Sequence, residues 1–132
     1  MRLWPLEILP QLPRQQLLGQ HRECCALRGK GWGRKHATVD YVFRHGLDRL
    51  YAYHLQVMNE MVSRGYTPDG KWYSRTYRGK LLPQSLLQEV GTYVYTGGTI
   101  YSEHDSAYLA ECVENLRRKG VKIEIRKERK IA

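Results

Sequence analysis

QLLGQHRECCALRG, residues 16–29, decides the fold at the start of this chain, because its pattern predicts an amphipathic helix. At about 100° per residue, Arg22 and Glu23 fall on the polar face, and Glu23 is expected to point away from the core. The apolar face is predicted to carry Leu17, Leu18, His21, Cys24 and Cys25. A lone carboxylate among arginines is either a solvated helix acid or a group that does chemistry on a polyanion.

Helices dominate the rest of the prediction. Pro13 suits the first turn of the helix just described, and Gly29 its end. A second and stronger pattern predicts a helix over 47–64, with Gly65 as its stop. Its apolar positions are Leu47, Leu50, Tyr51, His54, Leu55, Met58, Met61 and Val62.

The carboxyl-terminal part is predicted to hold two shorter helices and a small hairpin. One helix follows Pro83 and ends at Gly91, and a last helix runs from a cap at Ser102 to Gly120. The buried stripe of the last helix is predicted to consist of Tyr108, Leu109, Cys112, Val113 and Leu116. Residues 92–101 suit either a loop or a small β hairpin around Gly97-Gly98, and residues 121–125 alternate like a strand whose only plausible partner is the 92–101 segment. The 132 residues contain no linker that would divide them, so we expect a mainly α, compact domain over 1–132.

Charge and aromatic composition indicate a nucleic-acid partner. The net charge is +9, and ten Tyr and three Trp stand against one Phe. A basic protein rich in Tyr and Trp suits phosphate binding and base stacking. Two basic segments are candidates, a glycine-rich loop at 29–36 and an aromatic stretch at 66–80. The predicted contacts are Arg2, Arg28, Lys30, Trp32, Arg34, Lys35, His36, Arg75, Arg78 and Lys80.

Four short motifs occur in one order along the first half of the chain. They are Met1-Arg2, the run Gln15-x-Leu17-x-x-x-x-Arg22-Glu23, the triplet Arg34-Lys35-His36, and Arg64-Gly65-Tyr66 at the end of a helix. Together they resemble the pyrimidine-dimer DNA glycosylases, the phage endonuclease V family. That family carries an arginine three residues after its glutamate, where this chain has Ala26, and Arg28 is the candidate to replace it.

The resemblance implies a DNA repair glycosylase with AP-lyase activity that excises a damaged pyrimidine, with a pyrimidine dimer as one candidate. The α-amine of Met1 would attack C1′ of the sugar and form an imine, and β-elimination would then cut the strand. An α-amine suits this step because its pKa of about 7.7–8.0 leaves a useful neutral fraction. Met1 is expected to be retained, because Arg2 is bulky. Glu23 would stabilise the sugar cation and move protons, and Arg22 would orient Glu23 or a phosphate.

Several further expectations complete the sequence interpretation. The three cysteines and five histidines show no ligand spacing, so no metal and no cofactor are expected. No signal peptide or membrane span is visible, which favours the cytoplasm. The expected partner is double-stranded DNA with a damaged base or abasic site, and the protein is expected to be a monomer.

The alternative is a non-catalytic DNA- or RNA-binding protein on the same scaffold, with an RNA-processing lyase or nuclease as a weaker rival. An enzyme needs both a free terminus and Glu23, whereas a binder needs neither.

Overall fold

The computed structural model describes residues 2–35 and 38–125, and this part of the chain folds into helices without a strand. The mainly α prediction is therefore confirmed. None of the helices in the described part is both long and apolar enough to cross a membrane. In chain order the elements are η1 (Leu6–Gln11), α1 (Arg14–Arg28), α2 (Asp40–His45), α3 (Leu47–Ser63), η2 (Gly70–Tyr73), α4 (Leu87–Val90) and α5 (Ser106–Arg118).

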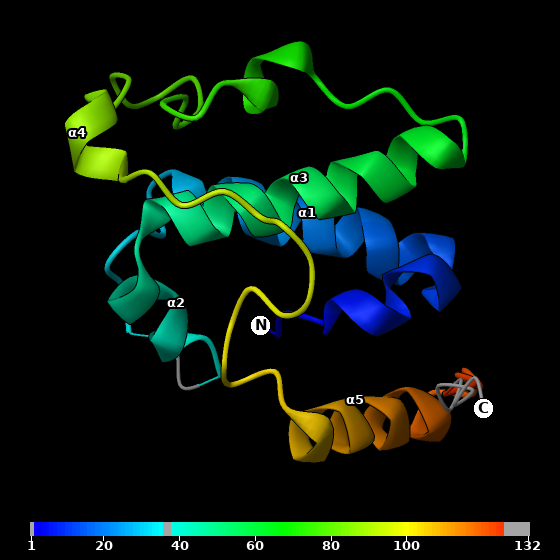
Figure 1. The fold of residues 1–132 in the computed structure, drawn as a ribbon. Coiled ribbons are helices and arrows are strands. Elements are labelled where there is room, and N and C mark those ends of the chain that lie inside the picture. The colour runs from blue at the N-terminus through cyan, green and yellow to red at the C-terminus, as the bar shows by residue number, and fades with distance from the viewer. Residues whose placement is uncertain (1, 36–37, 126–132) are drawn as a thin grey trace.

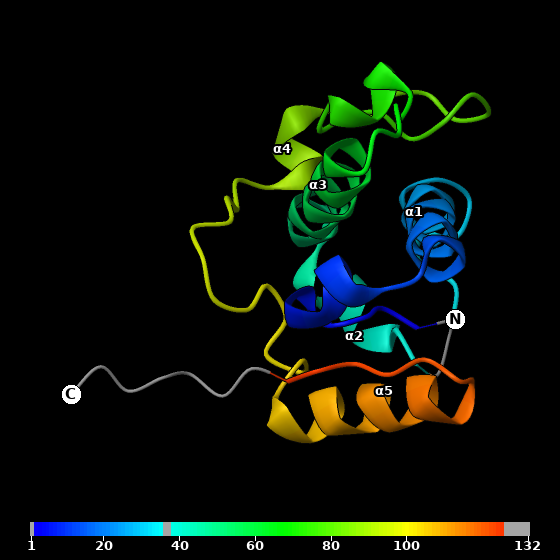
Figure 2. The same ribbon diagram turned by 90° about the vertical axis from the view of Figure 1, so that its right-hand side faces the viewer.

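The two long helices, α1 and α3, pack side by side and run in opposite directions (Figure 1). The amino-terminal segment and η1 lie between this pair and α5 (Figure 2). Helix α5 therefore covers the amino-terminal segment on the side that faces away from α1 and α3. The segment that contains η2 and α4 crosses the other side of α3.

The ends of the long helices follow the sequence signals. Helix α1 starts directly after Pro13 and stops at Gly29. After α3, Gly65 takes a φ of +90°, and the N–H of Tyr66 donates to the Met61 carbonyl at 2.9 Å. A positive φ costs glycine little, so this residue ends the helix as predicted. The guanidinium of Arg64 then reaches the Leu12 carbonyl at 2.7 Å and ties the end of α3 to the end of η1.

The core forms around α3, which is buried on more than one side. Half of the predicted apolar positions are buried, namely Leu50, His54, Met58 and Met61, and Tyr53 and Val57 are fully buried in addition. Leu47, Tyr51 and Leu55 are half-buried, and Val62, which is predicted in the core, is 52% exposed. Helix α1 also differs from its prediction. Gln20 and Leu27 are buried, while Leu18 is partly exposed. A helix that touches the amino-terminal segment as well as α3 has a wider buried surface than a single stripe predicts.

The described residues form neither a β hairpin within 92–101 nor a pairing of that segment with 121–125, so of the two predicted alternatives 92–101 is a loop. Side chains bind the backbone groups that a partner strand would have taken. The N–H of Tyr93 donates to Asp48 Oδ2 at 2.8 Å. On the other segment, the side-chain amide of Gln11 binds both the N–H and the carbonyl of Glu124, each at 2.7 Å. Once these groups are satisfied, the two segments gain nothing from pairing with each other.

The predicted start of the last helix is also wrong. Helix α5 begins at Ser106, and the Asp105 carboxylate caps it by accepting from the Tyr108 N–H at 2.9 Å. Ser102 lies in the turn before it. Aspartate is at least as good an N-cap as serine, and Asp105 fixes the helix start three residues later than predicted. Cys112 and Leu116 are buried, as the predicted stripe requires.

Candidate active site

The first described residues are held against α1 by one side chain, Gln20. Its amide nitrogen donates to the Arg2 carbonyl at 3.1 Å, and its amide oxygen accepts from the Trp4 N–H at 2.7 Å. The hydroxyl of Tyr53, on α3, donates to the same amide oxygen at 2.9 Å and also reaches the Trp4 carbonyl. The backbone at the start of the chain is therefore fixed between the two long helices.

Glu23 lies one turn after Gln20 on α1, so both side chains project from the same face of the helix. The carboxylate is less solvated than the sequence suggested. Its Oε2 is shut off from solvent and has no hydrogen-bond partner among the described residues. A buried polar atom without a partner is uncommon in folded proteins and is found where a ligand or a reaction uses it.

Arg22 is exposed beside this carboxylate. Its guanidinium folds back along the helix, since a Cβ added to Gly19 would lie 3.7 Å from Arg22 Nη2. The glycine leaves the polar face open at this turn. Arg22 and Glu23 thus occupy the same side of α1, within one turn of the side chain that holds the amino-terminal segment. Met1, the predicted nucleophile, lies outside the described residues.

Arg28 has a different environment, because its guanidinium is buried between α1, α3 and the segment after η2. It is 2% exposed and donates to the carbonyls of Trp72, Ser74 and Tyr77 at 2.6–3.1 Å. A fourth contact joins Nη1 to Nδ1 of His54 at 2.9 Å. Burial lowers the pKa of Arg28 to about 10, which leaves it charged at neutral pH. The structure therefore places this predicted DNA contact inside the protein.

Three potential metal ligands meet next to Arg28, although the spacing of histidines and cysteines along the chain does not indicate a metal site. Nδ1 of His21, Sγ of Cys25 and Nε2 of His54 lie within 4.8 Å of one another. The first two residues are four apart on α1 and the third comes from α3, so the cluster depends on how the helices pack. The two ring nitrogens are 2.8 Å apart, which is a hydrogen-bond distance.

The chemistry of this cluster fits a hydrogen-bond network better than a metal centre. A guanidinium can only donate, so Nδ1 of His54 accepts and the neutral ring carries its proton on Nε2. That proton points to His21, where a metal would need a lone pair. Metal-bound histidines also donate their other N–H to an acceptor, whereas His54 faces Arg28. Burial raises the pKa of Cys25 to about 12, so its thiol stays protonated at neutral pH.

The remaining predicted DNA contacts divide into two groups. One group turns inward: Arg75 donates to the Tyr93 carbonyl at 3.0 Å, and Arg78 binds the carbonyls of Arg28 and Gly29 at the end of α1. The other group is exposed, and consists of Lys30, Arg34, Lys35 and Lys80. Trp32 is half-buried with its ring edge against Phe43, and His36 lies outside the described residues. Of the predicted DNA contacts that are exposed, all except Lys80 lie in the loop that follows α1.

Sequence reasoning missed the groups that hold the amino-terminal segment. Gln20 and Tyr53 carried no recognisable motif, and their partners are backbone atoms far away in the sequence. The one available signal was an uncharged polar residue, Gln20, one turn before Glu23 on a helix with a charged polar face. The structure shows that the amide oxygen and the amide nitrogen of this side chain both form hydrogen bonds to the amino-terminal backbone.

The fold and site together define a small, basic, helical protein whose first residues are held beside an unpaired carboxylate. The chain belongs to the pyrimidine dimer DNA glycosylase family, whose family model matches residues 1–74. The matched part contains η1, α1, α2, α3 and the start of the segment after them. No curated protein and no solved structure gives a significant match to the chain.

Proposed function

We propose that this protein is a DNA glycosylase with AP-lyase activity, that its substrate carries a damaged pyrimidine, and that the α-amine of Met1 is its nucleophile. Membership of the family supports the glycosylase class. The observation that carries the rest is the position of the first described residues. Arg2 is bound through Gln20 to the face of α1 on which Glu23 has an unpaired carboxylate oxygen.

The proposed reaction needs few groups. The neutral amine forms a bond to C1′ of the sugar, while the bond from C1′ to the base breaks and its electron pair leaves with the base. Opening of the sugar ring at C1′ then gives the imine, and the proton lost by the attacking amine returns to the ring oxygen. Loss of a proton from C2′ next expels the 3′ phosphate and cuts the strand.

Glu23 suits two tasks in this sequence. A carboxylate near C1′ stabilises the positive charge that develops on the sugar as the base leaves. The same group can carry the proton from the amine to the ring oxygen, because a carboxyl group accepts and donates at one site. We assign Arg22, the exposed residue before Glu23 on α1, the task of binding a phosphate or orienting the carboxylate.

The substrate side of the proposal rests on charge. The exposed cations at Lys30, Arg34 and Lys35 form a loop that suits the DNA backbone, and the net charge of +9 favours binding of a polyanion. We further propose that the protein acts as a monomer in the cytoplasm. The three free cysteines are compatible with a reducing compartment.

Borohydride trapping tests the nucleophile directly. Full-length protein with a verified free amino terminus is incubated with duplexes that carry an abasic site, a thymine dimer or no lesion, in the presence and absence of borohydride. We expect strand cleavage of damaged duplexes and a covalent adduct on the abasic duplex, which peptide mapping should locate on Met1. Acetylation of the terminus should abolish the adduct and leave DNA binding intact.

The possible results separate the candidates. An adduct on Lys30 or Lys35 would keep the lyase class and refute the terminal amine. Binding of DNA without an adduct or cleavage would favour the non-catalytic binder, and cleavage of RNA in preference to DNA would favour the RNA-processing alternative.

A further inference from the structure

We propose that Tyr108, on α5, is a positioning residue that fixes the amino-terminal segment for attack on the sugar. This inference rests on the proposed function. Helix α5 lies outside residues 1–74, the part that the family model matches, so the match assigns it no role. The hydroxyl of Tyr108 donates to the Leu3 carbonyl at 2.8 Å. Leu3 is fully buried, so water cannot replace this hydrogen bond.

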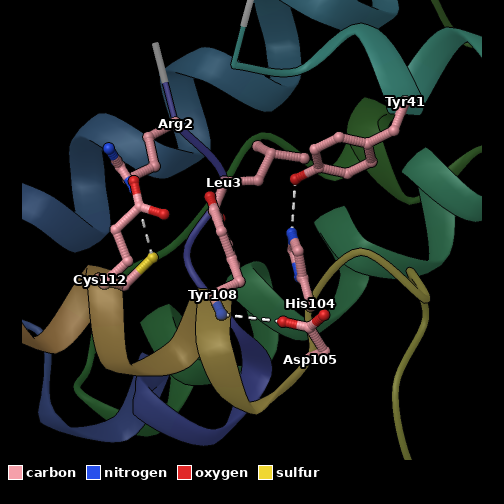
Figure 3. A network of polar contacts seen from close by, with 8 residues as sticks. Arg2, Leu3, Tyr41, His104, Asp105, Tyr108 and Cys112 are labelled. Atoms are coloured by element: carbon pink, nitrogen blue, oxygen red, sulfur yellow. Dashed lines mark hydrogen bonds and ion pairs between the residues drawn. The ribbon is translucent and has the colours of Figure 1, made fainter.

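The hydroxyl has a fixed position because both the ring and the backbone of Tyr108 are held (Figure 3). The ring of Tyr108 stacks on that of His104, with centroids 4.9 Å apart and planes inclined by 11°. His104 is held in turn by the hydroxyl of Tyr41, from α2, at 2.5 Å from its Nε2. The backbone of Tyr108 is fixed by the Asp105 cap at the start of α5. Its hydroxyl is therefore a preorganised donor.

The same helix also holds the side chain of Arg2. Its Nη1 lies 3.4 Å from Glu111 Oε1 and 3.6 Å from Cys112 Sγ, and its guanidinium carbon lies 5.8 Å from the centre of the Tyr108 ring. This cation is thus directed to α5, whereas the basic composition predicts it as a DNA contact. Figure 3 shows Arg2 and Leu3 side by side along α5.

These contacts complete the restraint that Gln20 begins. From α1, Gln20 holds the Arg2 carbonyl and the Trp4 N–H. From α5, Tyr108 holds the carbonyl between them and Glu111 holds the Arg2 side chain. The α-amine is joined to Arg2 through a single residue, so its freedom depends on how firmly that residue is held. Small displacements of a nucleophile are costly, because about 1 Å can reduce a rate 10²-fold.

The test is Tyr108→Phe in the full-length protein, with Tyr95→Phe as the matched control. The control also deletes a hydroxyl that donates to a backbone carbonyl, that of Gly98, but it lies on the exposed segment before Ile100. We would measure the single-turnover rate of borohydride trapping on an abasic duplex at saturating protein, the Kd for the same duplex, and the thermal midpoint. Tyr108→Phe should slow trapping roughly 10-fold or more. The Kd should stay within about twofold of the wild-type value, since the hydroxyl contacts no phosphate.

The outcomes are distinguishable. Trapping by Tyr108→Phe at the wild-type rate overturns the positioning role and leaves the proposed function standing. Absence of trapping by the wild-type protein overturns the proposed function itself. A role in stability alone would lower binding and trapping together, which also contradicts the inference. If Tyr108→Phe does not fold, Glu111→Ala serves instead, because its exposed carboxylate can be removed without disturbing the core. A wild-type trapping rate in that variant would overturn the inference.

Discussion

Helix α1 carries two arginine sites, six residues apart, that look equivalent in the sequence and differ in the structure. Arg22 is exposed beside Glu23, whose Oε2 has no partner among the described residues. Arg28 is 2% exposed, and its guanidinium nitrogens contact three carbonyls and the ring of His54. One site is open and incompletely paired, and the other is closed, with four contacts from its two terminal nitrogens to protein atoms.

This difference separates a group that serves the reaction from one that serves the fold. A buried cation that uses its donors on the protein has none left for a phosphate, but its removal leaves several buried acceptors unpaired. An acid with an unpaired, buried oxygen gains nothing for the fold from its charge. Charge alone does not distinguish the two sites. The number of satisfied partners does, and the following predictions test this interpretation.

The largest effect on stability is expected for Arg28→Met. Met fills similar volume and leaves the carbonyls of Trp72, Ser74 and Tyr77 without donors, which should lower the free energy of unfolding by about 3–5 kcal/mol. Denaturant unfolding measures this change. The control is Arg22→Met on the same helix, which should shift stability by less than about 0.5 kcal/mol because the side chain is exposed. Equal losses in both variants would contradict the comparison.

Glu23→Gln should have the opposite profile. The amide keeps the shape of the side chain and removes its charge, so base release should fall roughly 10²-fold or more. Stability should hold or rise, since a partly buried charge is gone. Single-turnover cleavage and denaturant unfolding are measured on the same samples, with Glu89→Gln on α4 as an exposed control. If the variant cleaves at the wild-type rate, Glu23 is an ordinary helix acid.

The sequence was sufficient for features that depend on local signals. Pro13 and Gly29 bound the first helix, and Gly65 ends α3 with a positive φ, as predicted. The apolar spacing found α3 and the buried face of α5. It did not predict α2, whose six residues are too few to show a periodic pattern.

The features that sequence reasoning missed depend on contacts between distant segments. The burial of Arg28 requires carbonyls from residues 72–77, which no pattern around α1 indicates. The hairpin prediction failed because Asp48 and Gln11 bind the backbone of the two segments from elsewhere. In the candidate site, Glu23 could be chosen from its motif, but Gln20 and Tyr108 could not, because they bind backbone atoms.

A third prediction concerns pH, because His54 and His104 are both buried. Burial lowers the pKa of His104 to about 4, and burial together with Arg28 lowers the pKa of His54. The unfolded chain takes up protons below its ordinary histidine pKa of about 6.5, while the folded protein does not. Stability should therefore fall between pH 6.5 and 4, by about 1.4 kcal/mol per pH unit for His104. Unfolding curves at several pH values measure the slope, which His104→Gln should reduce. An unchanged slope in that variant would contradict the buried, neutral state of His104.

The smallest expected effect compares exposed with inward-facing cations in DNA binding. About five phosphate contacts would give a log–log slope of affinity against salt of about −4 to −5. Lys30→Ala and Lys35→Ala should each make this slope shallower by about 1, because each side chain is exposed in the loop after α1. Lys122→Ala, an exposed lysine in the segment after α5, should leave it unchanged. A flat salt dependence of the wild-type protein would remove the electrostatic basis for DNA binding. If the two loop variants show the same salt dependence of DNA affinity as the wild type, residues outside this loop must bind the phosphates. The exposed loop would then have no phosphate-binding role to distinguish it from the buried arginines.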